Sequence, residues 1–288
     1  MELQELIQNI QKVEVLCEKL TQQKLSGLFN SSFKGRGWSI DSIRKYEVGD
    51  NIKDIDWNVT ARFRETFVKT FTQEKERLVW ILVDVSSSVM HPGSGKSKYD
   101  VAIEICAALA FSAIESQDQV GVLLYSDKIE RLIPAARGKV HFWRIAKELV
   151  TLKPSGKATD IAGAMRFLLQ SNAKSSVVFL LSDFIAGDYA KASLVFAQQH
   201  ELVAIRVFND HDGAVPKLGW ARMKDAESGA MRWLNTSSTA FQQRHQHQYK
   251  QVGEGFQEAY GGTAVASLSV STQGKYMEEL IHFLQHRR

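Results

Sequence analysis

From residue 78 onward, continuous apolar runs alternate with amphipathic segments. The apolar runs have the length of buried strands, and the segments between them have helical periodicity. The predicted strands are 78–84, 119–126, 176–182, 201–208 and 264–270, with a short additional strand at 129–133. The predicted helices are 98–116, 138–150, 160–171, 187–199, 238–258 and 275–286. This alternation predicts an α/β fold with a doubly wound, mainly parallel central sheet flanked by helices.

Residues 210–236 interrupt the alternation. Two short segments, 222–224 and 231–233, lie on either side of Glu227-Ser228-Gly229, which has the composition of a turn. This arrangement predicts an inserted β-hairpin.

The first 77 residues follow a different pattern. Apolar residues recur at helical spacing over 2–24, which predicts an amphipathic helix. Residues 25–77 have few apolar runs and many charges of both signs, and 67–71 is their best strand candidate. We therefore expect residues 1–77 to form an N-terminal helix and short-strand extension that packs on an α/β domain of residues 78–288.

The composition is that of a globular protein without a strong charge bias. Of the 288 residues 44% are hydrophobic, and 36 basic against 32 acidic residues give a net charge of +4. This excess is too small to indicate nucleic-acid or membrane binding. The two cysteines, Cys17 and Cys106, form no metal-binding pair. The N-terminal residues are charged throughout and lack the basic-then-apolar layout of a signal peptide, and no apolar run has the length of a membrane span. A cytoplasmic protein is expected.

The richest candidate site follows the first strand of the α/β region. The apolar run from Val79 ends in Asp84, which is followed by Ser86 and Ser88. Ligands of open α/β sheets bind beyond the carboxyl ends of such strands. One carboxylate and two hydroxyls are hard oxygen donors, which suit Mg²⁺ or Mn²⁺ better than zinc or copper.

Two further residues are expected at the same edge. Asp183 follows the apolar strand 176–182, and Thr159 lies in a loop that enters a helix. The set would hold an ion with two carboxylates and three weakly donating hydroxyls, leaving it able to bind one more anionic oxygen from a partner. The alternative for each residue taken singly is a helix cap or a turn.

Enzymatic interpretations of this region are less consistent with the sequence than a metal-binding site is. Residues 93–97, Gly-Ser-Gly-Lys-Ser, resemble a phosphate-binding loop, but Met90 stands where that motif needs glycine. A phosphatase with Asp84 as nucleophile would need a second carboxylate as general acid, and Ser86 occupies its common position. No nucleophile elbow surrounds Ser86 or Ser88.

Taken together, the five residues resemble the metal-ion-dependent adhesion site of von Willebrand factor type A domains, and the order of strands is similar to that Rossmann-like fold. A long upstream signature resembles the bacterial family named domain of unknown function 58. Pro216 and Gly219 also fit this family, and the resemblance covers residues 30–285. The residues of the upstream signature are Arg44, Tyr46, Gly49, Asp50, Lys53, Ile55, Asp56, Trp57, Thr60, Ala61 and Arg62. Two of the departures from the pattern, Lys53 and Val89, change no expected ligand.

The resemblance implies a binding module without enzymatic activity. In the adhesion-site pattern Ser86, Ser88 and Thr159 coordinate the ion directly, while Asp84 and Asp183 act directly or through water. Members of the family are thought to be adaptors or co-chaperones of MoxR-type AAA+ ATPases and to assist assembly of their clients. Many relatives carry N-terminal membrane helices, for which this sequence has no counterpart.

The leading hypothesis is therefore a protein that uses Mg²⁺, Mn²⁺ or Ca²⁺ to bind an acidic residue of a partner, such as a MoxR-type ATPase or its client. One alternative is a metal-dependent phosphoester hydrolase, because the same ion could polarise a phosphoryl oxygen. Another is that segment 30–77 is the working surface. Its candidate partner-binding residues are Arg44, Asp50, Asp56, Trp57 and Arg62.

Overall fold

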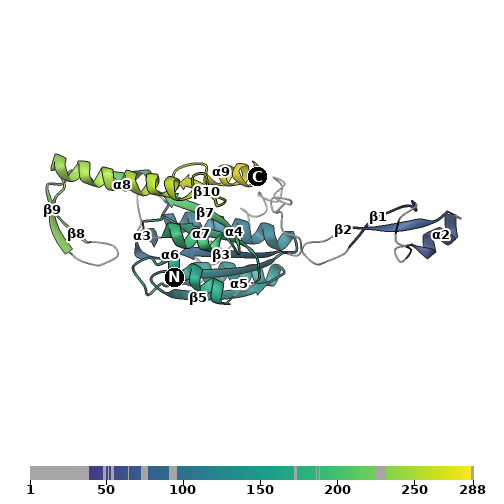
Figure 1. The fold of residues 1–288 in the computed structure, drawn as a ribbon. Helices are drawn as coiled ribbons and strands as arrows, with labels where there is room; N and C mark the ends of the chain where they lie inside the picture. The colour runs from purple at the N-terminus through teal and green to yellow at the C-terminus, as the bar shows by residue number, and fades with distance from the viewer. Residues whose placement is uncertain are drawn as a thin grey trace. The chain divides into compact units, whose positions relative to one another are not determined.

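The computed structural model divides into two compact units, one of residues 30–77 and one that contains residues 78–288 (Figure 1). The predicted helix 2–24 lies outside the described residues. The structure describes residues 39–47, 50, 52, 55–63, 65–72, 77–90, 96–171, 174–185, 187, 189–224 and 231–286.

The larger unit is built on a six-stranded sheet with the order β10-β7-β6-β3-β4-β5. Its strands are β3 (Leu78–Asp84), β4 (Gln119–Tyr125), β5 (Ile129–Ala136), β6 (Val177–Ser182), β7 (Glu201–Phe208) and β10 (Ala266–Ser271). All neighbours are parallel except β5, which is antiparallel to β4. The prediction of a doubly wound, mainly parallel α/β sheet is confirmed. β5 runs three residues beyond the predicted end at 133, and as an edge strand it tolerates Pro134.

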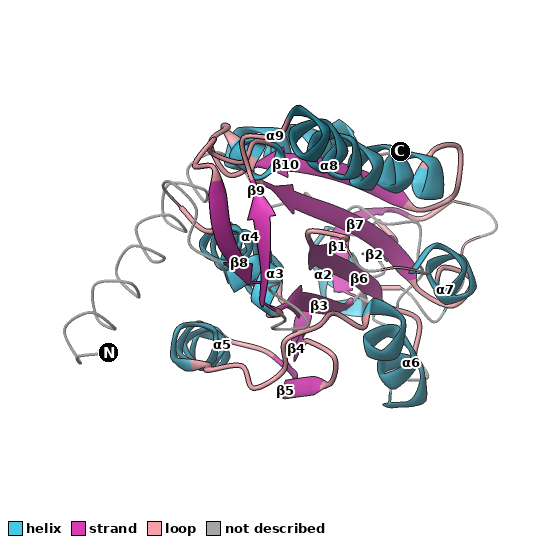
Figure 2. Cartoon of the chain, turned by 90° about the vertical axis from the view of Figure 1, so that its left-hand side faces the viewer, coloured by secondary structure: helices cyan, strands magenta, loops and turns pink. Residues whose placement is uncertain are grey.

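Helices cover both faces of the sheet (Figure 2). One face carries α4 (Lys98–Glu115), α5 (Lys139–Thr151) and α9 (Tyr276–His286), and the other carries α6 (Ile161–Ser171), α7 (Tyr189–Phe196) and α8 (Thr239–Tyr260). In β3 the side chains of Val79, Ile81 and Val83 enter the first of these two cores, and those of Trp80 and Leu82 enter the second. A strand buried on both faces therefore has a continuous apolar sequence, which is why the pattern located β3 so well.

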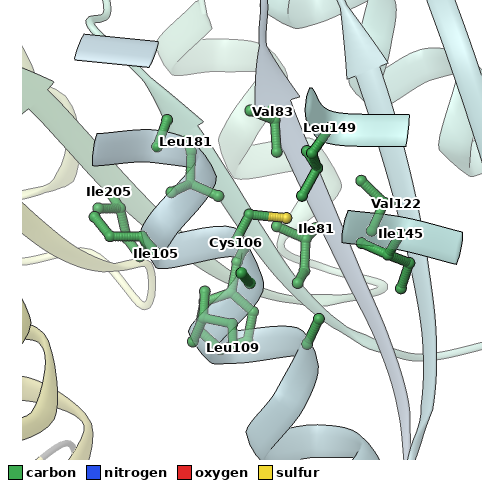
Figure 3. Packing of buried hydrophobic residues seen from close by; sticks show 14 of the residues in the cluster. Ile81, Val83, Ile105, Cys106, Leu109, Val122, Ile145, Leu149, Leu181 and Ile205 are labelled. Atoms are coloured by element: carbon green, nitrogen blue, oxygen red, sulfur yellow. The ribbon is translucent and has the colours of Figure 1, made fainter. Parts of the chain in front are cut away.

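Cys106 of α4 belongs to the first core. Its side chain is fully buried among Ile81, Val83 and Leu149 (Figure 3). Burial raises the pKa of the thiol, so the group stays protonated and packs as a small apolar side chain. This cysteine therefore contributes to the core and offers no reactive thiolate.

The predicted insertion at 210–236 is confirmed in the residues that the structure describes. It begins with the 3₁₀ helix η2 (Asp210–Gly213), and β8 (Trp220–Lys224) then pairs antiparallel with β9 (Met231–Asn235). The turn at 227–229 lies outside the described residues. No helix in the described part of the chain is long and apolar enough to cross a lipid bilayer.

The smaller unit contains β1 (Ser39–Lys45), the short helix α2 (Trp57–Phe63) and β2 (Phe67–Thr72). β1 and β2 pair antiparallel, with an irregularity in register between Ile40 and Ser42. The predicted strand 67–71 is confirmed as β2. The expected packing of residues 1–77 on the α/β domain stays a prediction.

Candidate functional site

The strand order places a topological switch point between β3 and β6. From β3 the chain continues to β4 and β5 on one side, and then to β6, β7 and β10 on the other. The connections that leave neighbouring strands β3 and β6 therefore diverge at their carboxyl ends. In open α/β sheets this divergence forms the crevice in which ligands bind.

Asp84, Ser86 and Ser88 form a hydrogen-bonded cluster at this point. Oδ1 of Asp84 accepts a hydrogen bond from the Ser86 amide at 2.9 Å, and Oδ2 accepts one from the Ser182 hydroxyl at 2.6 Å. The hydroxyl oxygens of Ser86 and Ser88 lie 3.1 Å apart. Asp84 and Ser86 are fully buried, whereas Ser88, in the short helix α3 (Ser87–Met90), is partly exposed. Only the outermost hydroxyl of this cluster thus faces solvent.

Asp183 follows β6 and is buried beside a lysine. Nζ of Lys98 lies 2.9 Å from Oδ2 of Asp183 and 3.0 Å from Oδ2 of Asp212. Burial lowers the pKa of Lys98, but the charges of Asp183 and Asp212 outweigh it, and the net pKa lies above its ordinary value. Lys98 is therefore a permanent cation shared by two carboxylates.

The loop that carries Thr159 is tied to the same edge. The Ser87 amide donates to the carbonyl oxygen of Lys157 at 3.0 Å, and the Asp160 amide donates to that of Ser126 at 2.9 Å. Oγ1 of Thr159 is shielded from solvent and has no hydrogen-bond partner among the described residues. An unsatisfied buried hydroxyl costs about 1–3 kcal/mol. A ligand bound to this oxygen would offset that cost.

The surroundings of Asp84 disfavour the ionised form of its carboxyl group. Burial raises the pKa of Asp84 to about 7, and the charge of Asp183 acts in the same direction. Hydrogen bonds from Ser182 and Ser86 lower it and offset part of the effect. No ion pair reaches Asp84 within the described part of the chain, since Lys98 contacts only the other two carboxylates. The site is short of positive charge at Asp84.

A cavity of about 550 Å³ opens beside the cluster. Ser88 and Asp183 lie in its wall, together with Lys98. The carboxyl end of the sheet, η2, β8 and α8 supply the rest of the lining. A group that enters this cavity can therefore reach the outer side of the Asp84 cluster.

Of the five candidate residues in segment 30–77, three make structural contacts within their own unit. Nη2 of Arg44 lies 2.7 Å from Oδ1 of Asp50, and the Arg44 guanidinium lowers the pKa of that carboxyl. Asp56 accepts from two amides at the start of α2, which makes it the helix cap. Trp57 and Arg62 are exposed on α2. Their role in partner binding stays a prediction.

The residues of the competing phosphate-loop motif that the structure describes have structural roles. Nζ of Lys96 lies 2.6 Å from Oε1 of Glu104 and 2.8 Å from the Tyr276 hydroxyl. Ser97 is the N-cap of α4 and forms a capping box with Asp100. Lys96 and Ser97 are thus committed to contacts that hold α4.

Sequence reasoning missed Lys98 and Ser182 as parts of the site. Ser182 is the last residue of β6, and its hydroxyl reaches Asp84 on the neighbouring strand β3. The position of Ser182 at the end of an apolar run could have indicated this from the sequence. Lys98 occupies the first turn of α4, where a cation opposes the helix dipole. A lysine in that position indicates a nearby carboxylate, but the sequence alone does not say which one.

Comparisons with known proteins identify relatives of uncharacterised function. The chain matches the family described as "Protein of unknown function DUF58" over residues 42–254. It is 28% identical over 222 residues to the uncharacterized proteins Mb1516 of Mycobacterium bovis and Rv1480 of Mycobacterium tuberculosis. Each alignment covers 75% of this chain and 70% of the relative.

The matches to solved structures are more distant. The protein BatB from Bacteroides thetaiotaomicron is 13% identical, with a TM-score of 0.47, and the match covers 73% of this chain and 97% of BatB. The VWA domain of SpRpn10 is 8% identical, with a TM-score of 0.39, over 73% of this chain and 94% of that domain.

The raised pKa of Asp84 predicts that the ion-free protein loses stability as the pH rises. In the unfolded chain this carboxyl has its ordinary pKa of 3.8, whereas in the folded chain its pKa is about 7. The stabilising contribution of the protonated form is complete below pH 3.8 and is lost as the pH rises through 7. In chelator-treated protein, the free energy of unfolding measured with urea should fall more steeply between pH 5 and 8 for the wild type than for Asp84→Asn. Equal slopes for the two proteins would contradict the assignment.

Proposed function

The chain belongs to the DUF58 family, and from this membership and the chemistry of the sheet edge we propose that it is a metal-dependent protein-binding module. The observation that carries the proposal is the hydroxyl of Thr159, which is buried without a hydrogen-bond partner among the described residues. Its loop is tied by backbone hydrogen bonds to the edge where Asp84, Ser86 and Ser88 form their cluster. A divalent cation would give this oxygen a ligand and would supply the positive charge that Asp84 lacks.

The donor set fits a hard cation. No group of three or more His, Cys, Asp or Glu side chains that could hold a metal occurs among the described residues, so an ion here must rely on hydroxyl oxygens as well. Ser86, Ser88 and Thr159 would supply the hydroxyls, with Asp84 and Asp183 as direct or water-mediated ligands. Oxygen-only ligation suits Mg²⁺, Mn²⁺ or Ca²⁺.

The position of the cavity supports recognition of an acidic partner. Ser88 and Asp183 reach its wall, whereas Asp84 and Ser86 are buried behind them. An ion held there would keep a coordination position toward the cavity. A glutamate or aspartate of a partner would fill it and neutralise the remaining charge.

The burial of Asp84 also bears on the alternative of a phosphatase with Asp84 as nucleophile. A nucleophilic carboxylate must touch the phosphorus of its substrate. Asp84 is 0% exposed, and both of its oxygens accept hydrogen bonds from protein groups. This geometry supports a role for Asp84 as an ion ligand rather than as a nucleophile. We propose a binding module without enzymatic activity; a hydrolase in which the ion itself polarises a phosphoryl oxygen is the second candidate.

For the partner we propose a MoxR-type AAA+ ATPase or its client, because the resemblance that the sequence carries implies an adaptor of such an ATPase. A cytoplasmic location stays a prediction. In this account the ATPase does the mechanical work, and the ion at the sheet edge fixes an acidic residue of the bound protein.

Thr159→Val separates an ion ligand from a structural hydroxyl. The hydroxyl has no hydrogen bond to lose among the described residues. The ion-free variant should therefore unfold at the same or a higher urea concentration than the wild type. Its affinity for Mn²⁺, measured by calorimetry, should fall at least tenfold. The control is Thr151→Val, whose hydroxyl donates to Lys147 O on an exposed helix end. Unchanged affinity in Thr159→Val would contradict the proposal.

Partner capture tests the function itself. Immobilised wild-type protein should retain a purified MoxR-type ATPase at a fixed Mg²⁺ concentration, and Asp84→Ala and Ser88→Ala should retain at least tenfold less. Comparing variants at constant Mg²⁺ avoids removing the ion that the ATPase itself needs. Ser171→Ala, on an exposed helix end, is the matched control for the serine variant and should bind normally. Equal retention by all four proteins would overturn the proposal.

A further inference from the structure

The cavity beside the Asp84 cluster has a mainly apolar wall. Most of this wall lies away from the ion ligands proposed above, toward β7, the hairpin insertion and α8. Its volume of about 550 Å³ is within the ordinary range for small-ligand sites, roughly 300–1,000 Å³. The apolar lining residues are Ile185, Phe208, Ala214, Val215, Pro216, Met223 and Val252.

Arg206 of β7 lines this cavity and is only 7% exposed. The centre of its guanidinium lies 4.9 Å from the centroid of the Phe208 ring. Nε is shielded from solvent and has no hydrogen-bond partner among the described residues, and no described carboxylate forms an ion pair with this side chain. A buried guanidinium stays charged and presents a planar set of donors, so its burial without a contacting anion is costly.

The other charged and polar groups of the wall are largely committed. Lys98 is shared between Asp183 and Asp212. His245 Nε2 lies 2.8 Å from the carbonyl oxygen of Asp212, and the Tyr249 hydroxyl donates to the carbonyl oxygen of Asn209 at 2.8 Å. Arg206 differs from these groups, because its Nε is buried without a hydrogen-bond acceptor among the described residues.

The helix opposite Arg206 leaves room for its head group. A Cβ built at Gly253 of α8 would lie 3.2 Å from Nη1 of Arg206, which is tighter than an ordinary contact. Glycine at this position therefore lets the guanidinium lie against the helix.

We propose that this cavity binds a ligand made of one carboxylate on an apolar body, with Arg206 as the carboxylate-binding residue. The guanidinium fork matches a carboxylate with two parallel hydrogen bonds, and the apolar wall takes the body of the ligand. Carboxylate binding by Arg206 needs no metal ion, and Arg206 is not one of the proposed ion ligands, although Ser88 and Asp183 of that set line the same cavity.

The charges of the wall favour a carboxylate over a phosphate. Asp183 and Asp212 lie in the same wall. Lys98 is one cation between these two carboxylates, so it neutralises only part of their charge. Both carboxylates repel a dianion more strongly than a monoanion. The single charge of Arg206 balances the charge of a monoanion but not that of a dianion. The ligand chemistry is shared by the C-terminus of a peptide with apolar final residues and by a free aliphatic acid.

Calorimetric titrations of the full-length protein, in chelator, test the proposal. The probes are N-acetyl-Phe-Leu with a free carboxylate, its C-terminal amide, octanoate and inorganic phosphate. The dipeptide acid or octanoate should bind, and the one that binds identifies the source of the carboxylate. The amide and phosphate should bind at least tenfold more weakly. Failure of both acids, or equal binding of the amide or of phosphate, would overturn the proposal.

Substitution then assigns the interaction to Arg206. Arg206→Met keeps the length of the side chain and should lose at least tenfold in affinity for the acid, with no loss of thermal stability. Arg166→Met, an exposed site on α6, is the matched control and should bind like the wild type. Unchanged affinity in Arg206→Met would overturn the assignment. Should that variant fail to fold, the comparison of acid with amide on the wild type decides the question.

Discussion

The structure depends on the burial of carboxylates at the ends of adjacent parallel strands. Asp84 ends β3 and Asp183 follows β6, and both are almost completely shielded from water. Burying charges this close is unfavourable unless cations or hydrogen-bond donors compensate them. Lys98 compensates Asp183, and the donors on Asp84 offset only part of its cost, since burial still raises the pKa of that carboxyl to about 7. The remaining deficit of positive charge is what makes this edge a candidate cation site.

The fold produces this arrangement from simple rules. Central strands are apolar on both faces, so their first polar side chains appear where the strands end, and parallel strands bring these ends to one edge. The switch point separates the following loops and leaves a crevice, which the hairpin insertion and α8 border as a cavity. The proposed ion ligands Ser88 and Asp183 and the arginine Arg206 therefore line one cavity.

The sequence predicted the regular part of the fold well, because strands such as β3 and β6 are continuous apolar runs with polar residues at both ends. It also located Asp84 and Asp183 at the carboxyl ends of β3 and β6. It did not predict the ion pairs of Lys98. Asp183 and Asp212 follow Lys98 by 85 and 114 positions in the sequence, and only the packing of the fold brings them together. Nor could it show that Thr159 lacks a hydrogen-bond partner within the described part of the chain or that Arg206 lines a cavity, since both depend on loop and helix positions that periodicity does not encode.

The most direct test of the central claim is the anomalous scattering of crystals of the wild-type protein grown in Mn²⁺. The account predicts one strong peak within about 2.5 Å of the hydroxyl oxygens of Ser86, Ser88 and Thr159, with Asp84 and Asp183 as direct or water-mediated neighbours. The ion should have an open position toward the cavity. A structure at saturating Mn²⁺ with no peak there, and with the three hydroxyls pointing away from one another, would contradict the account.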